Sequence, residues 1–532
     1  SGHQTWAAHD LLFVSSFGES NAREIALAHF TDESAKGDLP TLRVLGWDHA
    51  DTVPKLSHVA KTLHDKLRWP ARTHTAEDLA QWRKDWAGAF TLGYRQAIND
   101  AKTLALAMAE LAKRIRGRVN TVLALESDTG HLRQMHKAFK DNLIADLSDD
   151  AFADMFAQTI TYGLFTARAS RSSGALVADN LADMVPSTNP FLKELLGSFL
   201  SAAGRARNRE KRVDFDELGI NEVVTVLRDV PMDAVLRSFN ASKPGDDPVI
   251  HFYEDFLEVY DNALRKKTGS YYTPPEVVMS MVRLVDEALR SNAYFGLTDG
   301  LGDQNVTVVD PATGTGTYLL GILRRIAEAT EDDQGPGAVP GVIQAAIPRL
   351  IGFELQFGPF AVAQLRLLAE IRDLAGDNFA GHADPMRLYV TDTLSNPYLE
   401  DEYIPQILMP LGESRRQANE IKKQEKITVV IGNPPYKDKA KGLGGWVESG
   451  SGNRPGPFMD WMPPTAWNVG AHAKHLRNLY VYFWRWATWK VFGDGDPAEI
   501  KGRNRNQAGI VSFISAAGFL GGDGFQKMRA DL

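Results

Sequence analysis

The chain has 532 residues, 44% of them hydrophobic, and its 59 Lys and Arg against 67 Asp and Glu give a formal net charge of −8. This length exceeds what one hydrophobic core usually holds, so we expect several domains. The absence of cysteine excludes disulfides, cysteine-ligated zinc and a thiol nucleophile. We find no apolar run long enough to span a membrane and no signal-peptide pattern, so we expect a cytoplasmic protein.

The first half of the chain is predicted to be mainly helical. A short strand could form at residues 42–45, and apolar side chains then recur at helical spacing over residues 78–165. A segment rich in proline, glycine and aspartate at residues 242–248 is typical of a linker. We therefore expect a mainly α-helical domain in residues 1–245 and a second domain in residues 246–532.

The second domain alternates predicted strands and helices. Its short apolar runs predict strands at residues 306–309, 350–353, 388–391, 427–431 and 509–515. Helical patterns lie between the first three of these strands, at residues 317–329 and 361–374. Such alternation favours an α/β fold in which helices cover both faces of a parallel sheet.

The first predicted strand runs into a glycine loop that opens a helix. The loop reads Asp310-Pro311-Ala312-Thr313-Gly314-Thr315-Gly316. Its glycines allow close approach of backbone to a ligand, and a helix amino terminus adds a positive dipole end. Leu319 stands where a dinucleotide fingerprint has its third glycine, which argues against a nicotinamide dehydrogenase. A carboxylate directly after the strand suits a cationic ligand group better than a pyrophosphate; a purely structural tight turn is the alternative.

Acidic residues also follow the next two predicted strands. Glu354, which precedes Leu355, ends the second strand and could accept hydrogen bonds from ribose hydroxyls. Asp392, which precedes Thr393, follows the third strand and could accept from an exocyclic amine. Either acid alone could be a helix cap. Three acids at three successive strand ends, however, predict a ligand site at that edge of the sheet.

The fourth predicted strand ends in Asn433-Pro434-Pro435-Tyr436. The two prolines fix the backbone and remove two N–H donors. The Asn433 side-chain oxygen and the Pro434 carbonyl remain as acceptors, beside the aromatic face of Tyr436. This arrangement suits an amino group on a flat ring, and a rigid strand-exit turn is the alternative.

Together these segments resemble the motifs of N6-adenine DNA methyltransferases. The glycine loop is similar to their S-adenosylmethionine motif, and the Asn433–Tyr436 segment is similar to their catalytic motif. The segment Gly269-Ser270-Tyr271-Tyr272-Thr273-Pro274-Pro275 is similar to their remaining cofactor motif, and the order of the three is that of the gamma class. Residues 152–168, 478–489 and 509–529 resemble single-polypeptide type I (ISP) restriction–modification enzymes, the first of these segments their helical coupler.

The resemblance implies a Rossmann-like methyltransferase sheet preceded by a coupler-like helical domain, with the last strands and the target-recognition domain missing. S-adenosylmethionine is the implied cofactor, and no metal is implied. The implied cofactor-binding residues are Tyr271, Tyr272, Thr273, Pro274, Asp310, Pro311, Ala312, Thr313, Gly314, Gly316, Glu354, Leu355, Asp392 and Thr393. The implied catalytic residues are Asn433, Pro434, Pro435 and Tyr436, acting on an adenine flipped out of double-stranded DNA.

The resemblance also implies a bacterial restriction–modification or phage-defence role, with nuclease, translocase or other defence subunits as partners and no membrane. Two other functions stay open. One is a protein or RNA methyltransferase with the same catalytic loop; the other is a non-catalytic DNA- or phage-sensing scaffold that keeps the cofactor pocket. The basic clusters of the chain, among them the one from Arg415 to Lys426, are interpreted as solvated helix faces.

Overall fold

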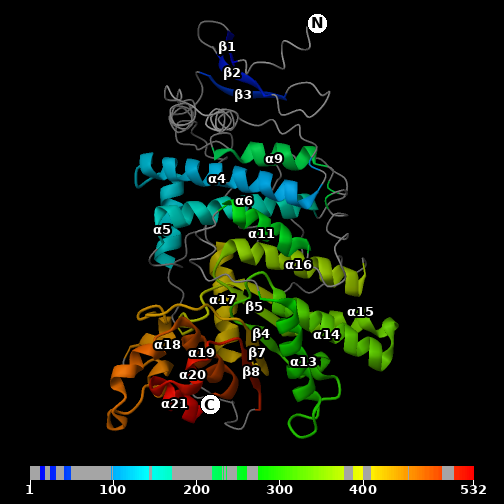
Figure 1. The fold of residues 1–532 in the computed structure, drawn as a ribbon, viewed down its shortest axis with the longest axis vertical. Coiled ribbons are helices and arrows are strands. Elements are labelled where there is room, and N and C mark those ends of the chain that lie inside the picture. The colour runs from blue at the N-terminus through cyan, green and yellow to red at the C-terminus, as the bar shows by residue number, and fades with distance from the viewer. Residues whose placement is uncertain are drawn as a thin grey trace, which may run out of the picture.

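The computed structural model describes residues 12–17, 24–31, 41–48, 98, 100–142, 147–169, 218–230, 232, 235, 248–260, 273–376, 387–398, 409–452, 455–493 and 508–532. Near the amino terminus, three antiparallel strands form a sheet of order β1-β2-β3 (Figure 1): β1 (Leu12–Phe17), β2 (Glu24–Thr31) and β3 (Thr41–Asp48). The strand expected at residues 42–45 is part of β3, whereas the other two strands had no predicted counterpart.

A helical layer follows this sheet along the chain. It comprises α4 (Ala101–Leu125), α5 (His131–Asn142), α6 (Asp149–Ala169), α9 (Ile220–Asp229) and α11 (Pro248–Tyr260). Asp100 caps the start of α4, because its carboxylate accepts a 2.9 Å hydrogen bond from the Thr103 N–H. Although α11 comes after residue 245, it packs within this layer, where the Phe252 ring stacks on Phe165 at 4.6 Å. The domain boundary at residue 245 therefore stays a prediction.

The second sheet holds five parallel strands in the order β6-β5-β4-β7-β8. The strands are β4 (Val308–Asp310), β5 (Leu350–Glu354), β6 (Arg387–Val390), β7 (Val429–Gly432) and β8 (Ile510–Phe513). Each overlaps a predicted strand, so the expected α/β class with a parallel sheet is confirmed. The chain builds outward from β4 to β6 and then returns to β7 on the other side of β4. Sheets of this kind bind ligands at such a reversal point, beyond the carboxyl ends of the strands.

Helices cover both faces of this sheet, and the strands alternate between two hydrophobic cores. One core takes Val308 and Val429, and the other takes their neighbours Val309 and Val430. The first core includes side chains of α13 (Pro275–Arg290), α14 (Thr317–Gln334), α15 (Val339–Ala346) and α16 (Phe357–Ala375). The second includes side chains of α17 (Met409–Gln424), α18 (Gly445–Ser449), α19 (Leu479–Phe492) and α21 (Gln526–Asp531), and the short helix α20 (Gly518–Gly521) follows β8.

The helical layer packs against α16, as Figure 1 shows. The ring of Phe139 meets the ring of Phe357 edge to face, with their centroids 5.9 Å apart. One continuous hydrophobic core includes buried residues of the helical layer together with residues of α13 to α16. Within the part of the chain that the structure describes, no helix combines the length and apolarity needed to cross a bilayer.

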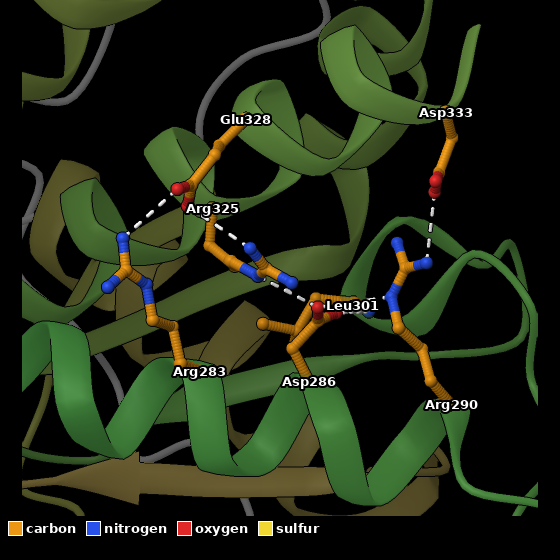
Figure 2. Close-up of polar contacts among 7 residues, drawn as sticks. All are labelled: Arg283, Asp286, Arg290, Leu301, Arg325, Glu328 and Asp333. Carbon is orange, nitrogen blue, oxygen red and sulfur yellow. Dashed lines mark hydrogen bonds and ion pairs between the residues drawn. The ribbon is translucent and has the colours of Figure 1, made fainter.

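An ion-pair network joins α13 to α14 (Figure 2). Asp286 is 1% exposed, and its carboxylate accepts from the Leu301 N–H at 2.8 Å. It also accepts from Arg290 at 3.1 Å and from Arg325 at 2.9 Å, and Arg325 in turn pairs with Glu328 at 3.1 Å. A buried carboxylate with three donors is fully compensated, so this network anchors α13, whose first turn leads into the candidate site.

Candidate active site at the carboxyl edge of the sheet

The acids predicted at successive strand ends lie side by side at the carboxyl edge of the sheet. Asp310 ends β4, Glu354 ends the neighbouring strand β5, and Asp392 follows β6. Backbone hydrogen bonds tie the loops together. The Thr313 N–H donates to the Phe353 carbonyl at 2.9 Å, and the Thr391 N–H donates to the Glu354 carbonyl at 2.9 Å.

The Asp310 side chain is fully buried, with 0% exposure. Its Oδ1 accepts a 3.1 Å hydrogen bond from the Ala312 N–H, whereas its Oδ2 has no hydrogen-bond partner among the described residues. Burial, together with the nearby negative charge of Glu354, raises the pKa of Asp310 to about 8. A cationic group bound here would therefore stabilise the carboxylate form of Asp310.

Glu354 supports the glycine loop directly. Its carboxylate accepts from the Gly314 N–H at 2.8 Å and from the Gln356 N–H at 2.7 Å, and burial raises its pKa. Gly314 and Gly316 have φ angles of 54° and 83°, in the left-handed region that favours glycine. Beside Glu354, the Leu355 side chain is 39% exposed. The loop is thus held in a shape that only glycine adopts without strain, with an exposed apolar side chain at its rim.

The Asp392 turn is held by a lysine that we predicted to lie on a solvated helix face. Lys422 of α17 is 0% exposed, so that interpretation is wrong for this residue. Its Nζ donates to the Asp392 carbonyl at 2.7 Å and to the hydroxyls of Thr391 and Ser395, each at 3.2 Å. Burial lowers the pKa of Lys422 to about 7, and burial raises the pKa of Asp392 despite the opposing lysine charge.

Thr393 and Thr313 bind backbone rather than pointing into an open space. The Thr393 hydroxyl donates to the Pro311 carbonyl at 2.5 Å, and the Thr313 hydroxyl donates to the Asp310 carbonyl at 3.0 Å. Both side chains are 5% exposed or less. The Thr393 contact joins the turn after β6 to the glycine loop after β4, whereas the Thr313 contact lies within that loop.

The Asn433-Pro434-Pro435-Tyr436 segment leaves β7 beside the glycine loop. The Asn433 amide donates to the Thr273 hydroxyl at 3.2 Å, while its Oδ1 is buried and has no partner among the described residues. The Tyr436 hydroxyl donates to the Ile514 carbonyl after β8 at 2.6 Å, which fixes the orientation of its ring. Burial raises the pKa of Tyr436 to about 12, so the hydroxyl stays protonated.

Part of the predicted cofactor motif before α13 reaches the same place. Thr273 contacts Asn433 and is 9% exposed, and Pro274 precedes the first residue of α13. Tyr271 and Tyr272 lie outside the described residues. The remaining predicted site residues are all assembled at this edge. Two buried oxygen atoms of these residues, Asp310 Oδ2 and Asn433 Oδ1, have no hydrogen-bond partner within the part of the chain that the structure describes.

Comparison with known families identifies the domain that carries this site. Residues 245–446 match the family model of N-6 DNA methylases. The adenine-specific methyltransferase PglX of Streptomyces coelicolor is 24% identical over 208 residues, which cover 35% of this chain and 16% of that protein. The match at residues 245–446 confirms the predicted resemblance to N6-adenine DNA methyltransferases.

Solved structures show where this fold recurs. The ATP-dependent Type ISP restriction–modification enzyme LlaBIII bound to DNA aligns with a TM-score of 0.56 at 19% identity, over 89% of this chain and 30% of that one. A nuclease-deletion mutant of the Type ISP enzyme LlaGI with a DNA substrate mimic aligns with a TM-score of 0.53 at 18% identity, over 90% and 34%. The DrdV–DNA complex aligns with a TM-score of 0.53 at 19% identity, over 86% of this chain and 39% of that one. The chain thus shares the fold of these proteins and spans well under half of each.

Proposed function

We propose that the chain is a site-specific DNA adenine methyltransferase that moves a methyl group from S-adenosylmethionine to N6 of adenine in a restriction–modification or phage-defence system. The observation that carries the proposal is the buried Oδ1 of Asn433, just after β7, which has no hydrogen-bond partner among the described residues. A buried acceptor without a donor costs free energy unless a ligand supplies one. An exocyclic amino group is a donor of the required kind.

The residues at the strand ends fit the cofactor. Asp310 Oδ2, for which the described part of the chain offers no hydrogen-bond donor, is the proposed acceptor for the positively charged methionine end. In this proposal Glu354, at the end of the neighbouring strand, accepts from ribose hydroxyls, and Asp392 and Leu355 contact the adenine ring. S-adenosylmethionine supplies an electrophilic methyl group. The chain's own contribution is to hold acceptors in place around it.

The catalytic segment acts by hydrogen bonding and orientation. Asn433 Oδ1 and the Pro434 carbonyl accept the two N6 hydrogens, which favours a more tetrahedral and more nucleophilic nitrogen. Neither Pro434 nor Pro435 has an N–H that would compete for these acceptors. Tyr436, oriented by its hydrogen bond to Ile514, offers a flat face to the ring of a base that has left the duplex. Acceptors that are fixed before the reaction need no reorganisation during it.

The partner and the place of action follow from the same proposal. The aligned proteins were solved with DNA or a DNA mimic, which supports double-stranded DNA as the substrate. An N6-adenine enzyme that acts on its host's DNA works in the bacterial cytoplasm. Nuclease or translocase functions would come from other segments or subunits of the defence system.

The test is base-resolved detection of N6-methyladenine in the DNA of a host that expresses the longest form its gene encodes. We expect methylation in one sequence context, which Asn433→Ala abolishes although S-adenosylmethionine still binds. Asn292→Ala, an exposed asparagine just after α13, is the matched control. Cofactor binding without DNA methylation would contradict the proposal and favour a protein or RNA substrate or a sensing scaffold.

A further inference from the structure

A buried arginine of α16 reaches the back of the glycine loop. Arg366 is 4% exposed, and its guanidinium donates to the Thr315 carbonyl. The same nitrogen lies 3.0 Å from the Thr315 hydroxyl and 3.1 Å from the Thr317 hydroxyl. Arg366 therefore binds both residues that flank Gly316, at the point where the loop becomes α14.

The same face of α16 also contacts the glycine between these residues. A Cβ built at Gly316 would lie 3.2 Å from the Ala363 Cβ and 3.6 Å from a methyl carbon of Leu367. Positions 363, 366 and 367 share one face of a helix because they are three and four residues apart. This face of α16 thus packs against the glycine loop, and Arg366 makes its polar contacts with the loop.

The hydrogen bond between the loop and Glu354 requires the backbone shape that α16 supports. Gly314 N–H reaches the Glu354 carboxylate at 2.8 Å only in the loop's present shape, which requires left-handed backbone at Gly314 and Gly316. Glycine gains the most conformational freedom when it is released, so a loop with two such positions needs external constraints to stay ordered. Hydrogen bonds from a buried cation are stronger than bonds between neutral groups, which makes the guanidinium an effective constraint.

We propose that Arg366 is a positioning residue that holds the Thr313–Thr317 loop in its cofactor-binding shape. This inference rests on the proposed function, since the ligand of the loop is taken to be S-adenosylmethionine. Arg366 acts through Thr315 and Thr317 rather than by touching the transferred methyl group. Its removal therefore weakens cofactor binding more than it slows transfer at saturating cofactor.

The test compares Arg366→Met with Arg366→Lys. Binding of S-adenosylmethionine is measured by titration calorimetry without DNA, and kcat is measured on DNA at saturating cofactor. We expect Arg366→Met to raise the Kd about tenfold or more, with kcat within about threefold of the parent. Arg366→Lys keeps a donor and restores part of the affinity. Arg372→Met, at an exposed position on the same helix, is the matched control.

A second variant keeps the inference falsifiable if Arg366→Met does not fold. Thr317→Val removes one acceptor, and we expect it to raise the Kd more than Thr317→Ser, which keeps the hydroxyl. Where Arg366→Met does fold, the double variant Arg366→Met/Thr317→Val should bind about as weakly as Arg366→Met alone, because the two residues act as one unit. Folded variants that bind S-adenosylmethionine as tightly as the parent overturn the inference, whether or not their kcat falls. A parent chain that binds no S-adenosylmethionine overturns the proposed function as well.

Discussion

Asp310 and Gly432 are packed so closely that a Cβ at position 432 would lie 2.7 Å from the Asp310 Oδ1. These residues end β4 and β7, the two strands between which the chain reverses direction across the sheet. The predicted cofactor acid therefore packs against the residue that directly precedes the predicted catalytic segment. Only glycine leaves room for it.

Gly432→Ala is expected to displace the Asp310 carboxylate. The added methyl group has no free space, so we expect a loss of about 1–3 kcal/mol in stability and at least a tenfold weaker affinity for S-adenosylmethionine. Gly341→Ala is the control, because a Cβ there meets nothing within 4 Å. Thermal unfolding and titration calorimetry measure both effects. Unchanged affinity in Gly432→Ala would show that the carboxylate position is not critical.

Cofactor binding is expected to release a proton from Asp310. Burial raises the pKa of Asp310 to about 8, so its carboxyl is mostly protonated at pH 7. A cationic ligand group favours the carboxylate and lowers this pKa, so binding at pH 7 releases close to one proton and strengthens as pH rises from 6 to 8. Calorimetry in two buffers of different ionisation enthalpy measures the release. Asp310→Asn should bind weakly and release none; equal proton release from this variant would assign the proton to another group.

Glu354→Gln is expected to affect binding rather than chemistry. The carboxylate accepts from two backbone N–H groups, and an amide would turn its NH₂ toward one of these donors. We expect the Kd for S-adenosylmethionine to rise about tenfold or more, with kcat at saturating cofactor within a fewfold. Glu331→Gln, on the exposed side of α14, is the control. A normal Kd would remove Glu354 from the cofactor site.

Lys422 is expected to make stability rise with pH above neutrality. Burial lowers its pKa to about 7, so in the folded chain it is largely neutral at pH 9, where the unfolded chain still holds the proton. The unfolded state then binds more protons, and the free energy of unfolding rises by up to about 1.4 kcal/mol per pH unit between pH 7 and 10. Denaturation of the parent and of Lys422→Met at pH 7, 8 and 9 isolates this contribution. Parallel curves for the two proteins would contradict it.

The effect of Gly358→Ala on stability is expected to depend on the side chain at position 158. A Cβ at Gly358 in the first turn of α16 would lie 1.9 Å from Gln158 Oε1 of α6, and Asp154 holds the same Gln158 side chain at 3.1 Å. Alone, Gly358→Ala should destabilise the chain by about 1–3 kcal/mol. With Gln158→Ala, the same change should be neutral or stabilising, because alanine is the better helix former. Additive effects in chemical denaturation would show that the two helices do not meet here.

Local sequence patterns predicted much of the fold that carries the candidate site. The five strands of the parallel sheet and the glycine loop were predicted within a few residues, because strand alternation and glycine spacing depend on neighbours along the chain. The position of the site also followed from local signals. Acids that directly follow parallel strands must meet at one edge once the sheet forms.

The tertiary structure decided which of several similar polar side chains contact the candidate site. Lys422 and Lys423 are adjacent in one basic run, yet only packing of α17 against the turn after β6 buries the first of them. Arg366 lies in a helix whose sequence shows no motif, 51 residues from the Thr315 that it binds. Asn433 and Thr273 are 160 residues apart. Contacts of this range depend on how helices and strands pack in three dimensions, and no spacing along the chain encodes them.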